Sequence, residues 1–247
     1  MLVAGLQVFE EIDFIKPCVQ SCCELFDHVV VLEGSWSTTA SIKGKRSSDG
    51  TIEQLEALCN DYDNLEVVFY NGINQISHRS AAWNYCKKYN PDWYLQGDGD
   101  EIFHEKDKDI IKETLSRYKP LDCVAPQHYL FWHDLEHYEM WNTAGARFFN
   151  TSGLDVEQIH AGPTCNQMNN SKNLFKRHVT DNFFIYHPSY AKRASRQDLK
   201  IKHRSADDGV QFPHILLDGK MYRNKSDWFN NLQIMEPLML PKYVRNK

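Results

Sequence analysis

The sequence lacks a long apolar run, and its first residues lack a basic cluster followed by an apolar stretch. The first absence excludes a membrane-spanning helix, and the second predicts that there is no signal peptide. The seven cysteines are odd in number and contain no Cys-x-x-Cys pair, which argues against a disulfide framework and against a zinc site. We therefore expect reduced thiols in a cytoplasmic protein.

An excess of basic residues is also missing. The net charge of -5 and the isoelectric point near 6.1 argue against a nucleic-acid or anionic-membrane partner. The local cluster of Lys43, Lys45 and Arg46 is an exception that can hold a phosphate. The chain has no internal repeat and no low-complexity tract, and 42% of its 247 residues are hydrophobic, so we expect a globular domain with a proper core.

Strand-like and helix-like patterns alternate along the first half of the chain. This alternation is typical of an α/β domain with a mostly parallel central sheet flanked by helices. Strands are predicted at 2–9, 28–32, 65–70, 92–96, 122–131, 145–149 and 182–186. Helices are predicted at 13–26, 51–61, 77–89, 107–118 and 192–202. We expect one domain over residues 1–200 and a short C-terminal extension, 201–247, that packs on it.

Acidic residues crowd the end of the predicted strand 92–96, in the stretch WYLQGDGDEIF. Asp98, Asp100 and Glu101 repel one another unless a cation or hydrogen-bond donors lie between them. Ligands of open α/β sheets collect at this edge, so a metal–diphosphate site is one interpretation and a solvated turn is the other. A calcium-binding EF-hand loop is excluded because it requires glycine where Phe103 stands.

Further blocks of residues fall in a fixed order around this cluster. They are Glu10-Glu11 after the first strand, VVVLEGS at 29–35, SDGT at 48–51, Arg79 with Ala82 and Asn84, Asp98-Gly99-Asp100, ARFFN at 146–150, Ile159-His160, and HPSY at 187–190 with Lys200. In this order the blocks resemble the nucleotide-sugar glycosyltransferases of the GT-A fold, family 2 type, over residues 1–200. Two departures are the insertion between Ser35 and Ser48 and the presence of Ala161 where the family has a glutamate.

The resemblance implies a GT-A (Rossmann-like) fold and an inverting glycosyltransferase. Such an enzyme transfers a hexosyl or deoxyhexosyl group from a nucleoside-diphosphate sugar to a glycan, a glycoprotein or another hydroxyl acceptor. Breaking that bond leaves growing negative charge on the diphosphate, which Mn²⁺ or Mg²⁺ bound by hard oxygen ligands stabilises. The inserted loop 36–47 suggests the hypothesis of a segment that closes over the donor.

The predicted metal ligands are Asp98, Asp100 and His187. Asp100 is the first choice for direct ligation, whereas the family's usage assigns Asp98 to the ribose or to a metal-bound water. His187 is alternatively a strand-end histidine bonded to a backbone carbonyl. Gly97 and Gly99 leave the backbone bare, which permits tight turning and the close approach of a phosphate.

The predicted nucleotide contacts come from several strand and helix ends. They are Glu11, Glu33, Arg79, Asp98 and Lys200. Glu11 and Glu33 end adjacent strands, where a carboxylate accepts hydrogen bonds from a base or a ribose. The alternatives are a helix N-terminal charge for Glu11, a loop surface for Glu33, a salt bridge for Arg79 and a solvated basic face for Lys200.

Inversion requires a carboxylate that takes the proton of the acceptor hydroxyl. The candidates lie after the acidic cluster and are Asp134, Asp155 and Glu157. Aromatic rings surround Asp134 in the stretch 129–141 and suit the apolar faces of a sugar, although such a stretch is equally suited to a hydrophobic edge or a dimer contact.

Two other functions remain open at this point. A nucleotidyltransferase that makes a sugar nucleotide would carry a glycine-rich basic loop after the first strand, where this chain has FEEID at 9–13. A non-catalytic module that binds a sugar or a nucleotide sugar on a decayed fold is favoured by Ala161 and disfavoured by the intact Asp98-Gly99-Asp100.

Overall fold

The first four strands form an all-parallel block within a nine-stranded sheet. The computed structural model describes residues 1–36, 45–132, 134–141, 146–152, 177–191, 214–217, 220–223, 233–235 and 239–245. The four strands are β1 (Leu2–Val8), β2 (His28–Glu33), β3 (Leu65–Phe69) and β4 (Trp93–Asp98). Their order is β3-β2-β1-β4, and all three pairings are parallel. β1 is buried throughout because helices cover both of its faces.

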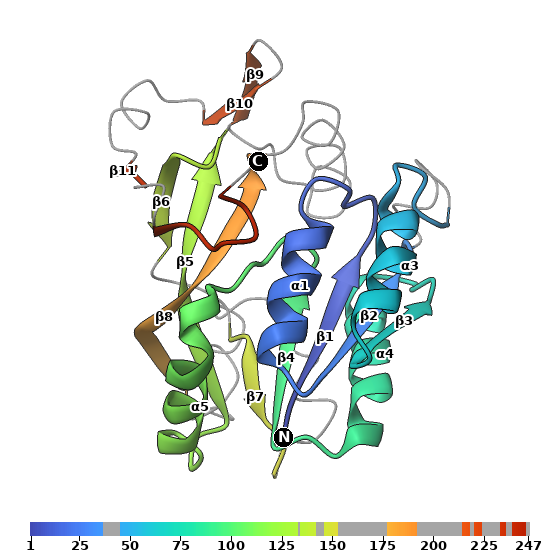
Figure 1. Cartoon of the computed structure of the whole chain (residues 1–247), viewed down its shortest axis with the longest axis vertical. Coiled ribbons are helices and arrows are strands. Elements are labelled where there is room, and N and C mark those ends of the chain that lie inside the picture. Colours follow the sequence, from blue (N-terminus) through green and yellow to red (C-terminus); the bar gives the residue numbers. More distant parts are fainter. Residues whose placement is uncertain are drawn as a thin grey trace.

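Helices cover the two faces of this sheet (Figure 1). The helices are α1 (Ile15–Leu25), α3 (Thr51–Asp61), α4 (Gln75–Cys86) and α5 (Lys108–Arg117), with the short 3₁₀ turns η1 (Lys87–Tyr89) and η2 (Glu105–Asp107). Leu6 and alternate residues of β1 pack with α1, α3 and α5, whereas Val3 packs with Ala82 of α4 on the other face. Since β2 and β4 flank β1 and their connecting helices lie on opposite faces, the topological switch point falls between β1 and β4.

Strands of mixed direction extend the sheet beyond β4. They are β5 (Cys123–Trp132), β6 (His137–Trp141), β7 (Phe148–Asn150), β8 (Arg177–Tyr190) and β11 (Gln233–Ile234), and a separate hairpin consists of β9 (His214–Leu217) and β10 (Lys220–Arg223). β7 pairs antiparallel with β4, and β8 runs parallel to β5. A bridge between Ile102 and Tyr186 joins β8 to the turn after β4. This bridge brings His187 to the acidic cluster.

Two described segments near the C-terminus contact this domain. β11 pairs with β6, and Leu240 and Val244 are buried in the hydrophobic core. Nζ of Lys242 lies 2.7 Å from a carboxylate oxygen of Glu24 on α1. The boundary at residue 200 stays a prediction, and the predicted helix 192–202 lies outside the described residues.

The predicted fold class, an α/β domain with a parallel sheet core flanked by helices, is confirmed. The strands and helices of the first half match their predicted ranges to within a few residues. No helix in the described ranges is long and apolar enough to span a membrane. The six cysteines that the structure describes are all free thiols.

Candidate functional site

The acidic cluster begins at the last residue of β4, beside the switch point. Its three carboxylates have different surroundings, because the side chain of Asp98 is 29% exposed whereas those of Asp100 and Glu101 are 6% and 1% exposed. Buried carboxylates require compensating cations or donors. This burial argues against the interpretation of the cluster as a solvated turn.

Arg147 compensates two of these carboxylates. Its Nε donates to Oε1 of Glu101 at 2.9 Å, and its Nη2 contacts the same oxygen and lies 3.2 Å from Oδ2 of Asp98. Burial alone raises the pKa of the Glu101 carboxyl, but the charge of Arg147 and the nearby His128 outweigh burial and lower that pKa to about 2. Glu101 is therefore a fixed anion. Sequence analysis included Arg147 in the block 146–150 but predicted no role for it.

Arg79 approaches Asp98 from the other side. It lies in α4, and its Nη2 is 3.5 Å from Oδ1 of Asp98. Its Nε donates to Oε1 of Gln7 in β1 at 3.0 Å. Its Nη1 is buried and makes no hydrogen bond to any residue that the structure describes. A buried guanidinium whose Nη1 amino group is unsatisfied is suited to an anionic ligand.

His187 lies beside Asp100. Nε2 of His187 is 3.2 Å from Oδ1 of Asp100, and both residues are largely buried. The other ring nitrogen, Nδ1, is buried and has no hydrogen-bond partner among the described residues. The predicted alternative was a hydrogen bond from His187 to a backbone carbonyl. No described residue provides such a carbonyl.

A second group of ligand atoms lies behind this pair. Glu101, His128 and His187 each offer one such atom, and these atoms lie within 4.8 Å of one another. Nδ1 of His128 is 3.2 Å from the carbonyl oxygen of Pro126, which only accepts, so Nδ1 carries the proton. Burial lowers the pKa of His128, and its Nε2 lies 3.5 Å from Oε1 of Glu101. A proton or a cation near both atoms stabilises this arrangement.

Sequence reasoning missed His128. It stands alone among aromatic and aliphatic residues of β5, a pattern that indicates a core strand rather than a site. Only the register of β5 against β8, which pairs His128 with Ile185 and Leu130 with His187, brings the two histidines close together.

The block 47–51 holds the loop after β1. Ser47 Oγ accepts from the backbone N–H of Glu10 at 2.7 Å, and Thr51 Oγ1 accepts from that of Glu11 at 2.7 Å. Oε1 of Glu10 in turn accepts from both the backbone N–H and the hydroxyl of Ser48, at 2.8 and 2.9 Å. The serine and threonine side chains thus fix the position of Glu11, and we name this group of hydrogen bonds the 47–51 clasp.

The two predicted nucleotide carboxylates lie at this edge. The side chain of Glu11 lies beside Gly99, since its Cγ would be 3.3 Å from a Cβ placed on that glycine. Glu33 is 1% exposed, and its Oε1 accepts from the backbone N–H of Ser47 at 2.7 Å. Oε2 of Glu33 lies 3.6 Å from Nε of Arg46. Their nucleotide roles stay predictions.

Packing against β1 explains the two glycines of the cluster. A Cβ on Gly97 would lie 2.7 Å from Cδ2 of Leu6, and a Cβ on Gly99 would lie 2.9 Å from Cγ2 of Val8. Both distances are too short for carbon atoms. A side chain at either position would therefore force Leu6 or Val8 to move even without a phosphate, so the glycines are no evidence for one.

Asp134 lies in the turn between β5 and β6. Its Oδ1 accepts from the backbone N–H groups of Glu136 and His137 at 2.8 Å, and both carboxylate oxygens lie 2.9 Å from Nδ1 of His137. These contacts are typical of a turn-forming aspartate. Three predicted site residues lie outside the described residues: Asp155, Glu157 and Lys200. Of the others, the structure brings together Arg79, Asp98, Asp100 and His187.

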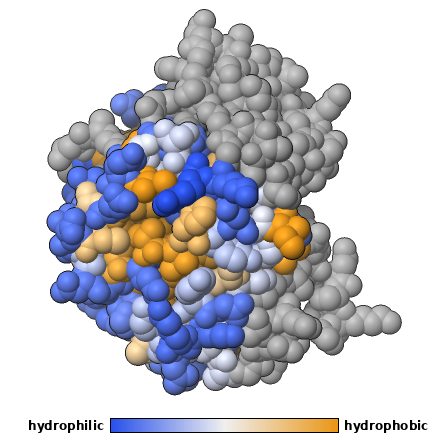
Figure 2. Space-filling model, turned by 90° about the vertical axis from the view of Figure 1, so that its right-hand side faces the viewer, coloured by the Kyte–Doolittle hydropathy of each residue, from blue (hydrophilic) through white to orange (hydrophobic). Residues whose placement is uncertain are grey.

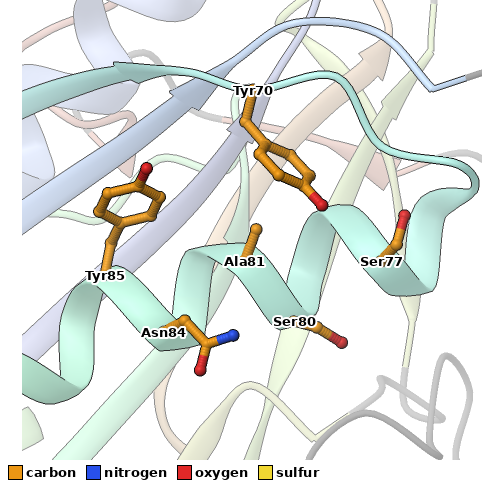
Figure 3. Close-up of a pocket in the computed structure, with 6 residues that line it drawn as sticks. All are labelled: Tyr70, Ser77, Ser80, Ala81, Asn84 and Tyr85. Atoms are coloured by element: carbon orange, nitrogen blue, oxygen red, sulfur yellow. The ribbon is translucent and has the colours of Figure 1, made fainter.

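A surface groove of about 470 Å³ lies on the outer side of α4 (Figure 3). Tyr70, Ala81 and Tyr85 line it together with Ser77, Ser80 and Asn84. The hydroxyl groups of Ser77 and Ser80 already donate to backbone carbonyls of Asn74 and Ile76. Its lining residues include none of the predicted ligands. Figure 2 views the molecule from the side of β3, where hydrophobic residues gather in a central area bordered by hydrophilic ones.

No protein-family model and no curated protein matches the chain. Similar solved structures include residues 1–349 of S. aureus TarS, with 12% identity and a TM-score of 0.49 over 83% of this chain. The same fragment in complex with UDP gives 11% and 0.45. The chain covers 66% of that fragment and 40% of the longer TarS structure. The 4-diphosphocytidyl-2C-methyl-D-erythritol synthase of Anaerococcus prevotii gives 8% and 0.46, with 82% of this chain and 94% of that chain covered. Similarity at this level defines neither a family nor an activity.

Proposed function

We propose that this chain is a metal-dependent, inverting GT-A glycosyltransferase of the cytoplasm. It transfers a hexosyl or deoxyhexosyl group from a nucleoside-diphosphate sugar to a glycan, a glycoprotein or another hydroxyl acceptor. The observation that carries the proposal is the meeting of Arg79, Asp98 and the Asp100–His187 pair at the β1–β4 switch point. Cationic and metal-ligating groups at this edge suit a diphosphate. The order of the sequence blocks is the reason for proposing a nucleotide sugar as the donor.

The Asp100–His187 pair fits a divalent cation. Neighbouring ligands of an octahedral Mg²⁺ or Mn²⁺ ion lie about 3 Å apart, and Oδ1 of Asp100 is 3.2 Å from Nε2 of His187. A carboxylate oxygen with an imidazole nitrogen suits Mn²⁺ in particular. A bound Mn²⁺ or Mg²⁺ ion supplies charge stabilisation for the departing diphosphate.

Arg79 is the proposed diphosphate contact of the protein itself. Gln7 and Asp98 fix two of its nitrogens, which leaves the buried Nη1 to donate to a phosphate oxygen. A donor that is already oriented stabilises developing charge without reorganisation. Glu11 and Glu33 are the proposed nucleoside contacts, and Lys200 is a further proposed phosphate contact.

The general base that deprotonates the acceptor hydroxyl is proposed to lie on the acceptor side of the site. In-line attack by an acceptor hydroxyl requires a carboxylate on that side, and the proposed candidates are Asp134, Asp155 and Glu157. Asp134 is half-buried and lies close to His137, so in this role it would accept a proton while His137 orients it.

The test is release of free nucleoside diphosphate from a panel of UDP, GDP, CDP and TDP sugars in the presence of Mn²⁺. Water acts as a slow acceptor, so no acceptor has to be known. We expect release from at least one donor, loss of release with EDTA, and a fall of at least about 100-fold in Asp100→Asn. Asp63→Asn, which changes an exposed turn carboxylate, is the matched control.

Two outcomes would contradict the proposal. Metal-dependent binding of a nucleotide sugar without any release indicates a non-catalytic module. Formation of pyrophosphate from a nucleoside triphosphate and a sugar phosphate indicates a nucleotidyltransferase.

A further inference from the structure

β3 forms one end of the nine-stranded sheet, and among the described strands only β2 pairs with it. The N–H of Tyr70, directly after β3, donates to the carbonyl of Glu33 in β2 at 2.9 Å. The backbone groups of successive residues alternate between the two sides of a strand, so the even-numbered residues of β3 bond to β2. The N–H and C=O groups of Val67 and Phe69 therefore point away from β2, and we name this side of the strand the β3 edge.

The β3 edge lacks the usual protection of an edge strand. Such strands commonly carry a lysine or a proline, or a bulge that turns them away from a neighbour. β3 has the sequence Leu-Glu-Val-Val-Phe and pairs with β2 in continuous register. Its one charged side chain, Glu66, accepts from Nζ of Lys88 and from the hydroxyl of Tyr89, at 2.8 and 2.9 Å. In the described part of the chain, the β3 edge is therefore open to a further strand.

Two hollows flank the β3 edge, one on each face of the sheet. The groove of about 470 Å³ lies on the α4 face, where Tyr70 and Tyr85 line it (Figure 3). A smaller hollow of about 230 Å³ lies on the α3 face, and its lining includes Val67, Phe69 and Glu56. Side chains of a strand alternate between the two faces of a sheet. An extended segment added at this edge would therefore place its side chains in the two hollows in turn.

Large apolar side chains are exposed around the β3 edge. Phe69 of β3 is 45% exposed, and Ile76 and Tyr85 of α4 are 46% and 36% exposed. They lie on the side of the molecule that Figure 2 shows, where hydrophobic residues gather in a central area. Exposed apolar surface with a polar border is typical of a site that binds another molecule.

The charges near the β3 edge are of one sign. The segment 51–70 forms α3 and β3 and has no lysine, arginine or histidine. Its acidic residues are Glu53, Glu56, Asp61, Asp63 and Glu66, and of these only Glu66 takes part in a salt bridge that the structure describes. A symmetric dimer through this edge would bring two copies of the same acidic surface together, which like charges oppose. The charge favours a basic partner instead.

Arg46 shows how a basic side chain binds at this edge. Its guanidinium lies 4.6 Å from the centroid of the Phe69 ring, and its Nε is 3.6 Å from Oε2 of the buried Glu33. An aromatic ring and a carboxylate thus hold a cation in the smaller hollow. Glu56 offers a further carboxylate there to a lysine or arginine of a partner, whose methylene groups would cover Val67.

We infer that the β3 edge is a docking site for an extended basic segment of a partner protein. The segment adds a strand beside β3. Its lysine or arginine side chains lie on the α3 face, and its aromatic or aliphatic side chains enter the groove between Tyr70 and Tyr85. The inference is independent of the proposed function, because β1 and β2 separate this edge from the acidic cluster.

The test measures fluorescence anisotropy of a short labelled peptide that alternates lysine with valine or tyrosine, in the presence of the full chain. We expect saturable binding, and none when glutamate replaces lysine in the peptide. Methylation of alternate backbone nitrogens separates strand addition from charge attraction, because only one set of backbone groups faces β3. Methylation of that set should abolish binding, whereas methylation of the other set should preserve it.

Two pairs of variants test the two faces. Glu56→Gln should weaken peptide binding about two- to fivefold. Glu53→Gln removes the same charge from α3 outside the hollow, so it should have a smaller effect. Tyr85→Ala should weaken binding on the order of fivefold, because an aromatic wall of the groove is lost. Ile110→Ala changes a similarly exposed side chain of α5 and should leave binding unchanged.

Three results would overturn the inference. The first is the absence of peptide binding to the wild type, and the second is an equal effect of the two methylated peptides. The third is an equal effect within both pairs of variants. A concentration-dependent dimer that binds no peptide would also overturn it, in favour of a second copy of the chain at the β3 edge. Failure of every nucleotide to bind would contradict the proposed function and would leave these results unchanged.

Discussion

Oε1 of Gln7 accepts a hydrogen bond from Nε of Arg79 at 3.0 Å, across the space between β1 and α4. The amide nitrogen of the same Gln7 side chain lies 3.5 Å from Nδ1 of His78, the helix neighbour of Arg79. A single buried amide thus orients two successive side chains of α4. Because Gln7 also pairs in register with Asp98, this contact links the helix to the acidic cluster.

Replacement of Gln7 by leucine should lower the free energy of unfolding by about 1–3 kcal/mol. The substitution keeps a similar volume but leaves Nε of the buried Arg79 without its acceptor. Urea denaturation of wild type and Gln7→Leu measures the difference. Gln7→Glu is the matched comparison, since it keeps the acceptor oxygen, and it should retain more of the stability. Equal loss in both variants would contradict this role of the amide oxygen.

His78 should make the protein less stable in mild acid. Burial lowers the pKa of His78 to about 4 from its usual 6.5. The unfolded chain therefore binds more protons between these values, so the free energy of unfolding falls as the pH decreases from about 6.5 to 4, by on the order of 2–3 kcal/mol in total. Urea denaturation at several pH values measures the slope.

The matched variant for this pH dependence is His78→Gln. It removes the titrating group while keeping a side chain that can donate to the carbonyl of Tyr70, which lies 3.2 Å from Nε2 of His78. The variant should have a smaller slope than the wild type between pH 6.5 and 4. Identical slopes would show that His78 does not titrate in this range upon unfolding.

The 47–51 clasp should be sensitive to the loss of one hydroxyl. In Thr51→Val the backbone N–H of Glu11 loses its acceptor at 2.7 Å, and Asp49 loses the hydroxyl that donates to its Oδ1 at 2.6 Å. We expect a loss of about 1–3 kcal/mol in the free energy of unfolding. Thr51→Ser keeps the hydroxyl and should cost less. A valine variant as stable as the serine variant would contradict the clasp.

The sequence predicted the first half of the fold well because its signals are local. The run VVVL of β2 and the alternation of polar and apolar residues in α1 are readable within a few residues of chain. The D-x-D was recognisable for the same reason, since Asp98 and Asp100 are neighbours. The position of ligands at the strand ends then follows from the general behaviour of parallel sheets.

The rest of the site depends on long-range pairing that no local pattern contains. Arg147 reaches Glu101 only because β7 pairs with β4, and His128 reaches His187 only because β8 aligns with β5. Asp98 was predicted to contact the metal or the ribose because its D-x-D resembles that of the family. Its two arginine partners come from α4 and from the residue before β7, and neither pairing is visible along the sequence.

The most direct test of the central claim is a thermal-shift screen of UDP, GDP, CDP and TDP, each with and without Mn²⁺, on wild type and Asp100→Asn. A nucleotide at about one hundred times its Kd adds about 2.7 kcal/mol, which is several degrees in Tm for a domain of this size. At least one nucleotide should raise the Tm of the wild type with Mn²⁺, and EDTA or Asp100→Asn should remove this increase. Stabilisation that is equal without metal and in Asp100→Asn, or none from any nucleotide, would contradict a metal–diphosphate site at the end of β4.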